Sequence, residues 1–133
     1  MIDVAVIGGG LAGCSVAIQM ARAGHDVVIF EAGSYPRHKL CGEFLSPEAQ
    51  SSLDRLGVRA DLEAHHPPRI NRSVVTASGG ATDTVALPAA AWGISRYVLD
   101  ALLATHASEA GATVKTGCRV SDIVGTLDTG FTV

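Results

Sequence analysis

Short apolar runs along the chain alternate with longer segments in which apolar residues recur at helical spacing. Residues 2–7, 27–30 and 112–116 are the short runs, and the first two are rich in valine and isoleucine. An unbroken apolar run is typical of a strand that is buried on both faces of a parallel sheet. The segment from Leu11 to Ala23 consists mainly of small and apolar residues and predicts a helix that ends at Gly24. The pattern therefore predicts three strands and a helix that joins the first two.

Two more helices are predicted from their start signals. Ser46 stands before Pro47, a pairing that favours an N-cap followed by the first helical residue, and Gly57 marks the end of this helix. Ser95 caps the other helix, which reaches Ala110 and carries leucine, valine and alanine at helical spacing on one face. Both helices are therefore expected to pack one apolar side against a core.

The region between these two helices has strand character. Residues 73–77 and 82–87 are strand-like, and Gly79-Gly80 between them is a hairpin signal. Residues 120–124 and 131–133 flank a further turn-rich linker. We therefore predict an α/β fold in which a Rossmann-type parallel-sheet half-domain carries an inserted β-rich segment.

The composition limits the classes of function. Of the 133 residues, 47% are hydrophobic and 17% are charged, which is typical of a globular domain with an apolar core. The net charge of −3 provides no basic face for nucleic acid or for an anionic membrane, so neither is expected as a partner. The apolar start contains Asp3 and four glycines, which argues against a signal peptide and against a transmembrane segment.

The cysteines and histidines give no sign of a metal site. Cys14, Cys41 and Cys118 are odd in number and widely spaced, which fits neither a disulfide framework nor a zinc site. His65 and His66 precede two prolines and are interpreted as part of a solvated loop. We expect no metal, and we expect a reducing, cytoplasmic compartment.

The segment from Gly8 to Gly13 matches the pattern G-x-G-x-x-G, and its context makes the match specific. It follows a buried strand and opens a helix, and the next strand ends in Glu31, 18 positions after Gly13. Gly8 permits the tight turn, Gly10 lets a pyrophosphate approach the backbone, and Gly13 lets the helix and the strand pack closely. The helix start at Leu11 offers unpaired N–H groups and a positive dipole end. These residues predict a site for the ADP part of a dinucleotide.

Glu31 narrows the choice of dinucleotide. Its carboxylate is suited to accept hydrogen bonds from both ribose hydroxyls, and it would repel a 2′-phosphate, which argues against NADP at this site. NAD and FAD share the ADP half, so the glycines and Glu31 fit either of them. An NAD-binding dehydrogenase domain therefore stays open beside a flavoprotein.

Later segments resemble a flavoprotein family. Residues 36–47, with the sequence PRHKLCGEFLSP, are similar to the second cofactor segment of the geranylgeranyl reductase-like flavoproteins, within the larger class related to p-hydroxybenzoate hydroxylase. Flavin-dependent halogenases are similar there too. Residues 93–100 resemble the Arg-x-x-Leu/Phe-Asp helix start of the same proteins, and residues 112–114 and 118–120 resemble their third strand and adenine-side segment. The resemblance covers residues 2 to about 125.

The resemblance implies FAD as the cofactor. It implies that Ala12 and Glu31 touch the ADP part, that Arg96 reaches the cofactor, and that Val120 flanks the adenine. Cys41, Gly42 and nearby backbone are implied to approach the FAD. The residues that the glycine pattern and the resemblance together assign to the cofactor are Gly8, Gly10, Leu11, Ala12, Gly13, Glu31, Ala32, Arg37, Cys41, Gly42, Arg96 and Val120.

Three of the candidate residues have alternative interpretations. Arg96 stands in the first turn of a helix, where a cation opposes the dipole, so it either meets a bound anion or bends back to solvent. Arg37 is either a phosphate ligand or a solvated loop charge. Trp92 either stacks on a flavin or is a buried anchor before the following helix.

The function implied by the resemblance is that of an FAD-dependent oxidoreductase. NAD(P)H reduces the flavin, which then either saturates an isoprenoid-type double bond or activates oxygen to hydroxylate a small organic substrate. No residue of this chain is assigned a catalytic role.

The end of the chain, Phe131 to Val133, lies within a strand-like run, and the resemblance implies a flavin-binding motif that would come later. We therefore expect the amino-terminal part of an FAD-binding domain that is inactive by itself, with a truncated, non-enzymatic fragment as an alternative. The strand order that the resemblance implies puts both other parallel strands on one side of the first strand, which would leave its other edge open. The parts expected are a βαβ unit at 2–31, a loop and helix at 32–57, a β-rich insert at about 69–91, and a helix and third strand at 95–117.

Overall fold

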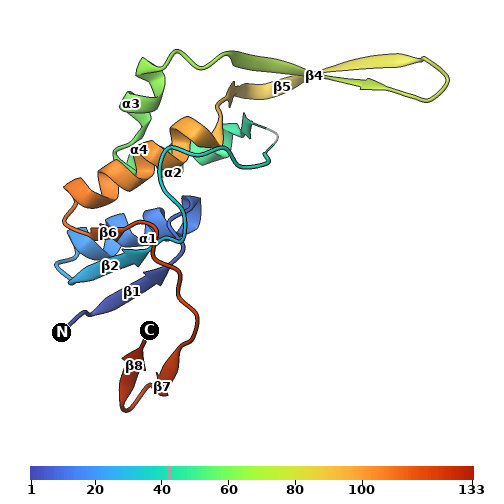
Figure 1. Ribbon diagram of the computed structural model, residues 1–133. Helices are drawn as coiled ribbons and strands as arrows, with labels where there is room; N and C mark the ends of the chain where they lie inside the picture. The colour runs from blue at the N-terminus through green and yellow to red at the C-terminus, as the bar shows by residue number, and fades with distance from the viewer. Residues whose placement is uncertain (42) are drawn as a thin grey trace.

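A parallel three-stranded sheet forms the centre of the protein. The computed structural model describes residues 1–41 and 43–133 (Figure 1). Strands β1 (Val4–Ile7), β2 (Val27–Phe30) and β6 (Thr113–Lys115) lie in the order β1-β2-β6 and are all parallel. β1 therefore lies at an edge with β2 and β6 on one side of it, as the resemblance implies.

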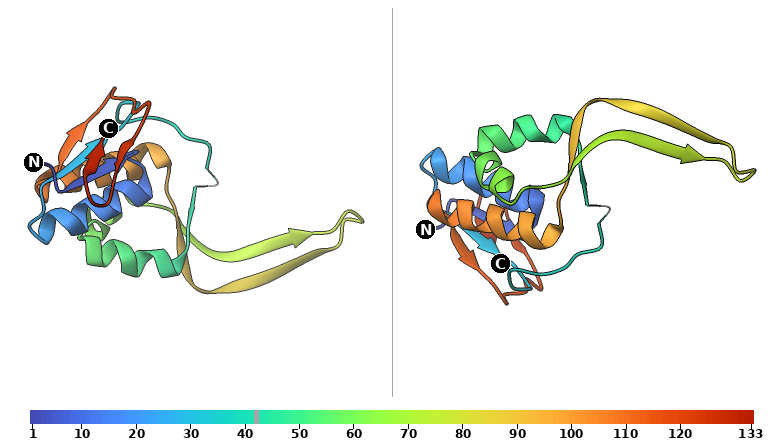
Figure 2. Two further views of the ribbon diagram at one scale, coloured as in Figure 1. Left: turned by 90° about the horizontal axis from the view of Figure 1, so that it is seen from below. Right: turned by 90° about the horizontal axis from the view of Figure 1, so that it is seen from above.

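Four helices form the layer on one face of this sheet. α1 (Leu11–Arg22) and α4 (Arg96–Glu109) pack against the sheet and against each other, and α2 (Pro47–Leu56) and α3 (Arg59–Ala64) pack onto them (Figures 1 and 2). The helices bury the apolar faces that their spacing predicts. The buried side chains between these elements include Cys14, Ala17, Ile18, Val27, Ile29, Leu53, Leu56, Leu62, Leu99, Leu103 and Ala107.

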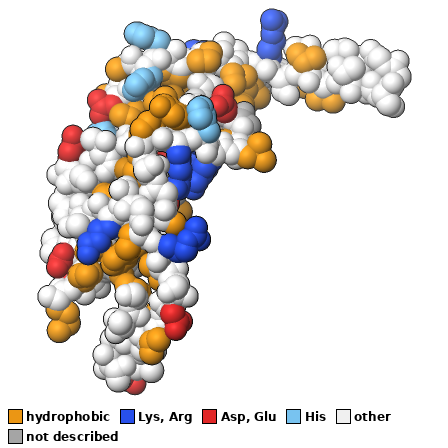
Figure 3. Space-filling model, in the orientation of Figure 1, with side chains coloured by type: hydrophobic (Ala, Val, Ile, Leu, Met, Phe, Trp, Pro, Cys, Tyr) orange, Lys and Arg blue, Asp and Glu red, His pale blue; other side chains and the backbone are white. Residues whose placement is uncertain are grey.

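The inserted β-rich segment is a long hairpin arm. β4 (Arg69–Thr76) and β5 (Thr82–Gly93) pair antiparallel, and β3 (Phe44–Leu45) adds to β5 at the base of the arm. Figure 2 shows the arm projecting from the helical layer. Its outer part is exposed on both faces, including apolar side chains that Figure 3 shows scattered along it. The arm therefore contributes little to the buried core.

Trp92 anchors the base of the arm to the helices. Its side chain is fully buried, and the guanidinium carbons of Arg59 and Arg69 lie 5.6 and 4.6 Å from its ring centroid. Glu63 pairs with both arginines, at 3.3 and 3.5 Å. These contacts confirm the interpretation of Trp92 as a buried anchor before α4.

The C-terminal hairpin lies on the face of the sheet opposite to the helices. It consists of β7 (Val124–Thr126) and β8 (Gly130–Thr132) (Figures 1 and 2). Ala5 and Ile7 of β1 line a hollow together with Phe131 of β8. Along β1, side chains that pack on the helical core therefore alternate with side chains that face the hairpin.

The structure agrees with most predicted boundaries and differs at short elements. The turn-rich linker predicted between residues 124 and 131 is shorter in the structure, because β7 extends to Thr126 and β8 begins at Gly130. α3 and β3 were not predicted, because six helical residues show too little periodicity and β3 exists only through its pairing with β5. Among the described residues, no helix combines the length and the hydropathy needed to cross a bilayer.

The close contact between α1 and β1 gives a stability prediction. A Cβ at position 13 would overlap the carbonyl oxygen of Gly8 and lie 3.1 Å from Cγ1 of Val6. Gly13→Ala should therefore lower the free energy of unfolding by roughly 1–3 kcal/mol, measured by urea denaturation. Gly79→Ala in the arm is the control, since no described atom lies within 4 Å of the added methyl group. Equal stability of Gly13→Ala and the unchanged protein would contradict the prediction.

Candidate functional site

The loop between β1 and α1 has the backbone that the glycine pattern requires. Gly8 adopts a φ of 96°, a left-handed value that glycine tolerates, and its N–H donates to the carbonyl oxygen of Phe30 at 2.8 Å. Gly13 lies against the Gly8 carbonyl, so that any side chain there would overlap the backbone. The predicted roles of these two glycines, in the turn and in close packing, are confirmed.

Gly10 faces a space that is lined by two cationic groups. The atoms nearest to a Cβ built at Gly10 are Nη2 of Arg96 at 3.6 Å and Nζ of Lys39 at 3.7 Å. α1 begins at Leu11, and its first turn contains no acidic residue. The leading N–H groups of the helix and the positive end of its dipole add to the two side-chain charges. The space beside Gly10 therefore suits an anion such as a phosphate group.

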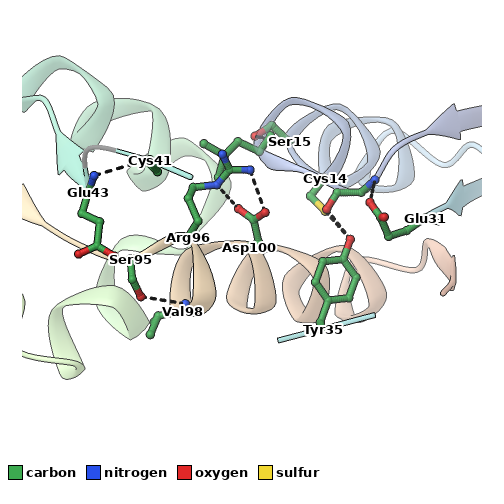
Figure 4. A network of polar contacts seen from close by, with 12 residues as sticks. Cys14, Ser15, Glu31, Tyr35, Cys41, Glu43, Ser95, Arg96, Val98 and Asp100 are labelled. Carbon is green, nitrogen blue, oxygen red and sulfur yellow. Dashed lines mark hydrogen bonds and ion pairs between the residues drawn. The ribbon is translucent and has the colours of Figure 1, made fainter. Parts of the chain in front are cut away.

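The Gly9 carbonyl is held by two side chains that the sequence did not reveal as part of the loop. The Tyr35 hydroxyl donates to this oxygen, and the Cys14 thiol donates to it at 3.4 Å. Figure 4 shows both side chains at the start of α1. Burial raises the pKa of the Cys14 thiol and of the Tyr35 hydroxyl, so both stay protonated and remain donors. The orientation of the Gly9–Gly10 peptide is fixed in this way.

Glu31 lies directly after β2 and is only 4% exposed. Its Oε2 accepts a hydrogen bond from the Gly9 N–H at 2.8 Å, and its Oε1 accepts from the Gly33 N–H at 2.8 Å. Nη1 of Arg37 lies 2.6 Å from the same Oε1. The bond from Arg37, together with those from Gly33 and Gly9, lowers the pKa of Glu31 to about 2, although burial opposes this. The carboxylate is therefore ionised at neutral pH.

Neither interpretation of Arg37 fits the structure. Arg37 is neither over the glycine loop nor free in solvent, because it forms the ion pair with Glu31. Lys39, not Arg37, lies beside Gly10 together with Arg96. The pairing also weakens the argument against a 2′-phosphate, since Arg37 offsets the negative charge of Glu31.

Arg96 lies at the glycine loop, so the alternative in which it bends back to solvent is wrong. Its side chain is 18% exposed, and its guanidinium is paired with the buried carboxylate of Asp100. The sequence analysis includes Asp100 in the helix-start motif but gives it no role, although an arginine and an aspartate four residues apart on a helix are an ordinary signal for an ion pair. Asp100 offsets part of the conflict between Arg96 and the dipole of α4.

The predicted adenine-side residues lie near Glu31. Ala32 follows it and is exposed, and Val120 is partly buried. The Cys118 N–H donates to the Glu31 carbonyl oxygen at 2.9 Å, which holds the segment before Val120 against the end of β2. The roles of Ala32 and Val120 toward a cofactor stay predictions.

The predicted segment around Cys41 lies near the start of α4. Cys41 is exposed, and its Sγ accepts a hydrogen bond from the Glu43 N–H at 3.4 Å. Gly42 lies outside the described residues. Leu11 and Ala12, also predicted to bind the cofactor, form the first turn of α1.

Several known oxidoreductases are similar to this chain in sequence. Residues 3–39 match the family described as FAD dependent oxidoreductase. Menaquinone reductase from Mycolicibacterium smegmatis is 35% identical over 127 residues, which cover 91% of this chain and 30% of that protein. Kynurenine 3-monooxygenase from Salinispora arenicola is 39% identical over 84 residues, which cover 58% of this chain and 18% of that protein. The chain thus spans less than a third of the length of these relatives.

Solved structures of flavin-dependent enzymes share the fold. The flavin-dependent brominase Bmp2 superposes with a TM-score of 0.81 at 26% identity, over 94% of this chain and 31% of that chain. The flavin-dependent halogenase CmlS superposes with a TM-score of 0.80 at 32% identity, over 91% of this chain and 23% of that chain. The chain therefore has the fold of the corresponding part of these flavin-dependent enzymes, and its residues 3–39 match the FAD dependent oxidoreductase family.

Proposed function

We propose that this chain binds FAD through its ADP part and forms the cofactor-binding part of an FAD-dependent oxidoreductase. The observation that carries the proposal is the space beside Gly10, with Arg96 and Lys39 as its nearest side chains and the start of α1 at its base. A pyrophosphate brings negative charge to a place where two side chains and a helix dipole supply positive charge. The match of residues 3–39 to the FAD-dependent family supports the choice of FAD.

Glu31 is suited to hold the adenosine ribose. A carboxylate offers about four acceptor sites, and three of those on Glu31 are taken by described N–H donors, from Gly9, Gly33 and Arg37. Acceptor capacity remains at Oε2, which bonds only the Gly9 N–H among the described groups. We propose that one ribose hydroxyl donates here, and that Val120 flanks the adenine. Arg37 fixes the carboxylate in place for this contact.

The proposed reaction is a two-electron reduction of a small organic substrate. FAD supplies the electron-transfer chemistry when it is bound, with NAD(P)H as the proposed donor. The role of this chain is to bind and orient the cofactor, through Gly10, Arg96 and Lys39 at the phosphates and Glu31 at the ribose. We propose reduction of an isoprenoid-type double bond, as in a geranylgeranyl reductase-like enzyme, because a reductase matches over most of the chain. Hydroxylation is the second candidate, favoured by the monooxygenase match over a shorter segment.

Flavin content tests the proposal directly. The purified chain is incubated with FAD and, separately, with NAD, and unbound nucleotide is removed by gel filtration. The proposal expects a yellow protein that releases FAD on denaturation. Retention of NAD without retention of FAD would instead support the NAD-binding dehydrogenase domain. Reduction of an isoprenoid-type double bond by NAD(P)H in the absence of oxygen would support the first candidate, and a requirement for oxygen would support hydroxylation.

Gly10→Val tests the phosphate position. Gly10 has an ordinary φ of −86°, so a side chain is tolerated by the backbone, but it would project between Arg96 and Lys39. FAD affinity should fall by at least ~100-fold while the melting temperature changes little, measured by calorimetry and by circular dichroism. A Gly10→Val protein that keeps stoichiometric FAD would show that the phosphates bind elsewhere.

Glu31 gives a pH prediction for stability. Its pKa is about 2 in the folded protein against an ordinary value of 4.5, so ionised Glu31 stabilises the fold above about pH 5, and this contribution is lost as the pH falls toward 2. The shift corresponds to roughly 3 kcal/mol. In Glu31→Gln this dependence is absent, so the difference in unfolding free energy between the two proteins should narrow from about pH 6 to about pH 2. A difference that is constant over this range, measured by urea denaturation, would contradict the assignment.

A further inference from the structure

Asp100 is a fully buried carboxylate that the proposed cofactor contacts do not use. Its side chain has 0% exposure, and both of its oxygens are bonded by one guanidinium. Nε of Arg96 donates to Oδ1 at 2.5 Å, and Nη2 donates to Oδ2 at 2.8 Å. The two side chains therefore form a bidentate pair, in which the planar groups fix each other's orientation.

The pair lies between two helix starts. Figure 4 shows Arg96 and Asp100 extending from α4 toward α1, with their planar groups facing each other. Arg96 is the first residue of α4, and its Nη2 is 3.6 Å from the place where a Cβ of Gly10 would lie. A guanidinium has five N–H groups, and Asp100 receives two of them. Nη2 carries two of the five N–H groups and gives one to Asp100, so a second N–H lies on the nitrogen nearest to Gly10.

Orientation matters more for Arg96 than for Lys39. The ammonium of Lys39 is a point charge on a flexible, exposed stem, which acts from many positions. The Arg96 fork is specific only if its plane is fixed, and the place it occupies opposes a cation because the positive ends of two helices lie near it. Asp100 provides both the fixed plane and the offsetting charge.

We propose that Asp100 is a positioning residue that holds the Arg96 guanidinium beside Gly10, ready to bond the pyrophosphate of FAD. This inference rests on the proposed function and deepens it. Asp100 touches no part of the cofactor itself. It acts through Arg96 alone, and its effect is confined to ligands that carry a phosphate.

The test compares ligands with and without phosphate on Asp100→Asn, which keeps the shape of the side chain. ADP and adenosine share the adenine and the ribose, so a loss of affinity that is confined to ADP reports on the contacts to the phosphates. Calorimetry on the 133-residue protein should show ADP and FAD affinity lowered by roughly 10-fold or more, with adenosine affinity unchanged. Asp54→Asn is the matched control, because Asp54 also pairs with an arginine, Arg59, at 2.8 Å, but in an exposed position on α2. Asp54→Asn should leave the affinities for ADP and for adenosine unchanged.

A double-mutant cycle separates positioning from a purely structural role. Arg96→Lys keeps a charged partner for Asp100 but removes the fork, and it should itself lower ADP affinity without changing that for adenosine. In the Arg96→Lys background, Asp100→Asn should have little further effect on ADP. If Asp100→Asn does not fold, the single variant Arg96→Lys still tests the proposal. Unchanged ADP affinity in Arg96→Lys would overturn it.

Other outcomes also overturn the proposal. Equal losses of ADP and adenosine affinity in Asp100→Asn would show that the pair only supports the fold, and so would an undiminished effect of Asp100→Asn in the Arg96→Lys background. If the unchanged protein binds neither ADP nor FAD, the proposed function itself fails. If it binds both and Asp100→Asn binds them equally well, only this inference fails.

Discussion

Glu31 connects the ends of the three parallel strands at the candidate site. It does so through its carboxylate and through its peptide groups. The carboxylate accepts from Gly9 in the loop after β1 and from Gly33 in the loop after β2. The Glu31 N–H donates to the Lys115 carbonyl oxygen at 2.8 Å, and the Cys118 N–H donates to the Glu31 carbonyl oxygen. One residue thus joins the carboxyl ends of β1, β2 and β6. In a parallel sheet this is the edge where ligands bind, and Glu31 fixes its geometry from within the sheet.

Charge is divided between two parts of the site. Arg37 neutralises Glu31 at the proposed ribose end, whereas Lys39 and Arg96 lie beside Gly10 at the proposed phosphate end. Asp100 offsets the positive charge of Arg96, but it leaves the charge of Lys39 and of the helix dipoles in place. Positive charge is therefore left over beside Gly10, where an anionic part of a nucleotide would be stabilised.

Rigid packing supports this arrangement from the opposite side of the loop. Tyr35 and Cys14 bond the Gly9 carbonyl, and the Gly13 backbone lies against Gly8. By contrast, the β4–β5 arm is exposed along most of its length and makes no part of this region among the described residues. The candidate site thus depends on the compact body of sheet and helices, where backbone contacts leave little freedom.

Local sequence determined the features that depend on near neighbours in the chain. The turn at Gly8, the close packing at Gly13, the N-cap of α4 and the acid at the end of β2 follow from residue type and spacing. The reason is that φ preferences and helix starts are local properties. Tertiary structure alone decided which cation lies beside Gly10, why Tyr35 belongs to the loop, and where Val120 lies. Those contacts join residues from separate elements, and the packing of α1 and α4 on the sheet sets their distances. For Asp100, both contributed. Its spacing from Arg96 indicates an ion pair, but only the tertiary structure shows that this pair is buried beside the start of α1.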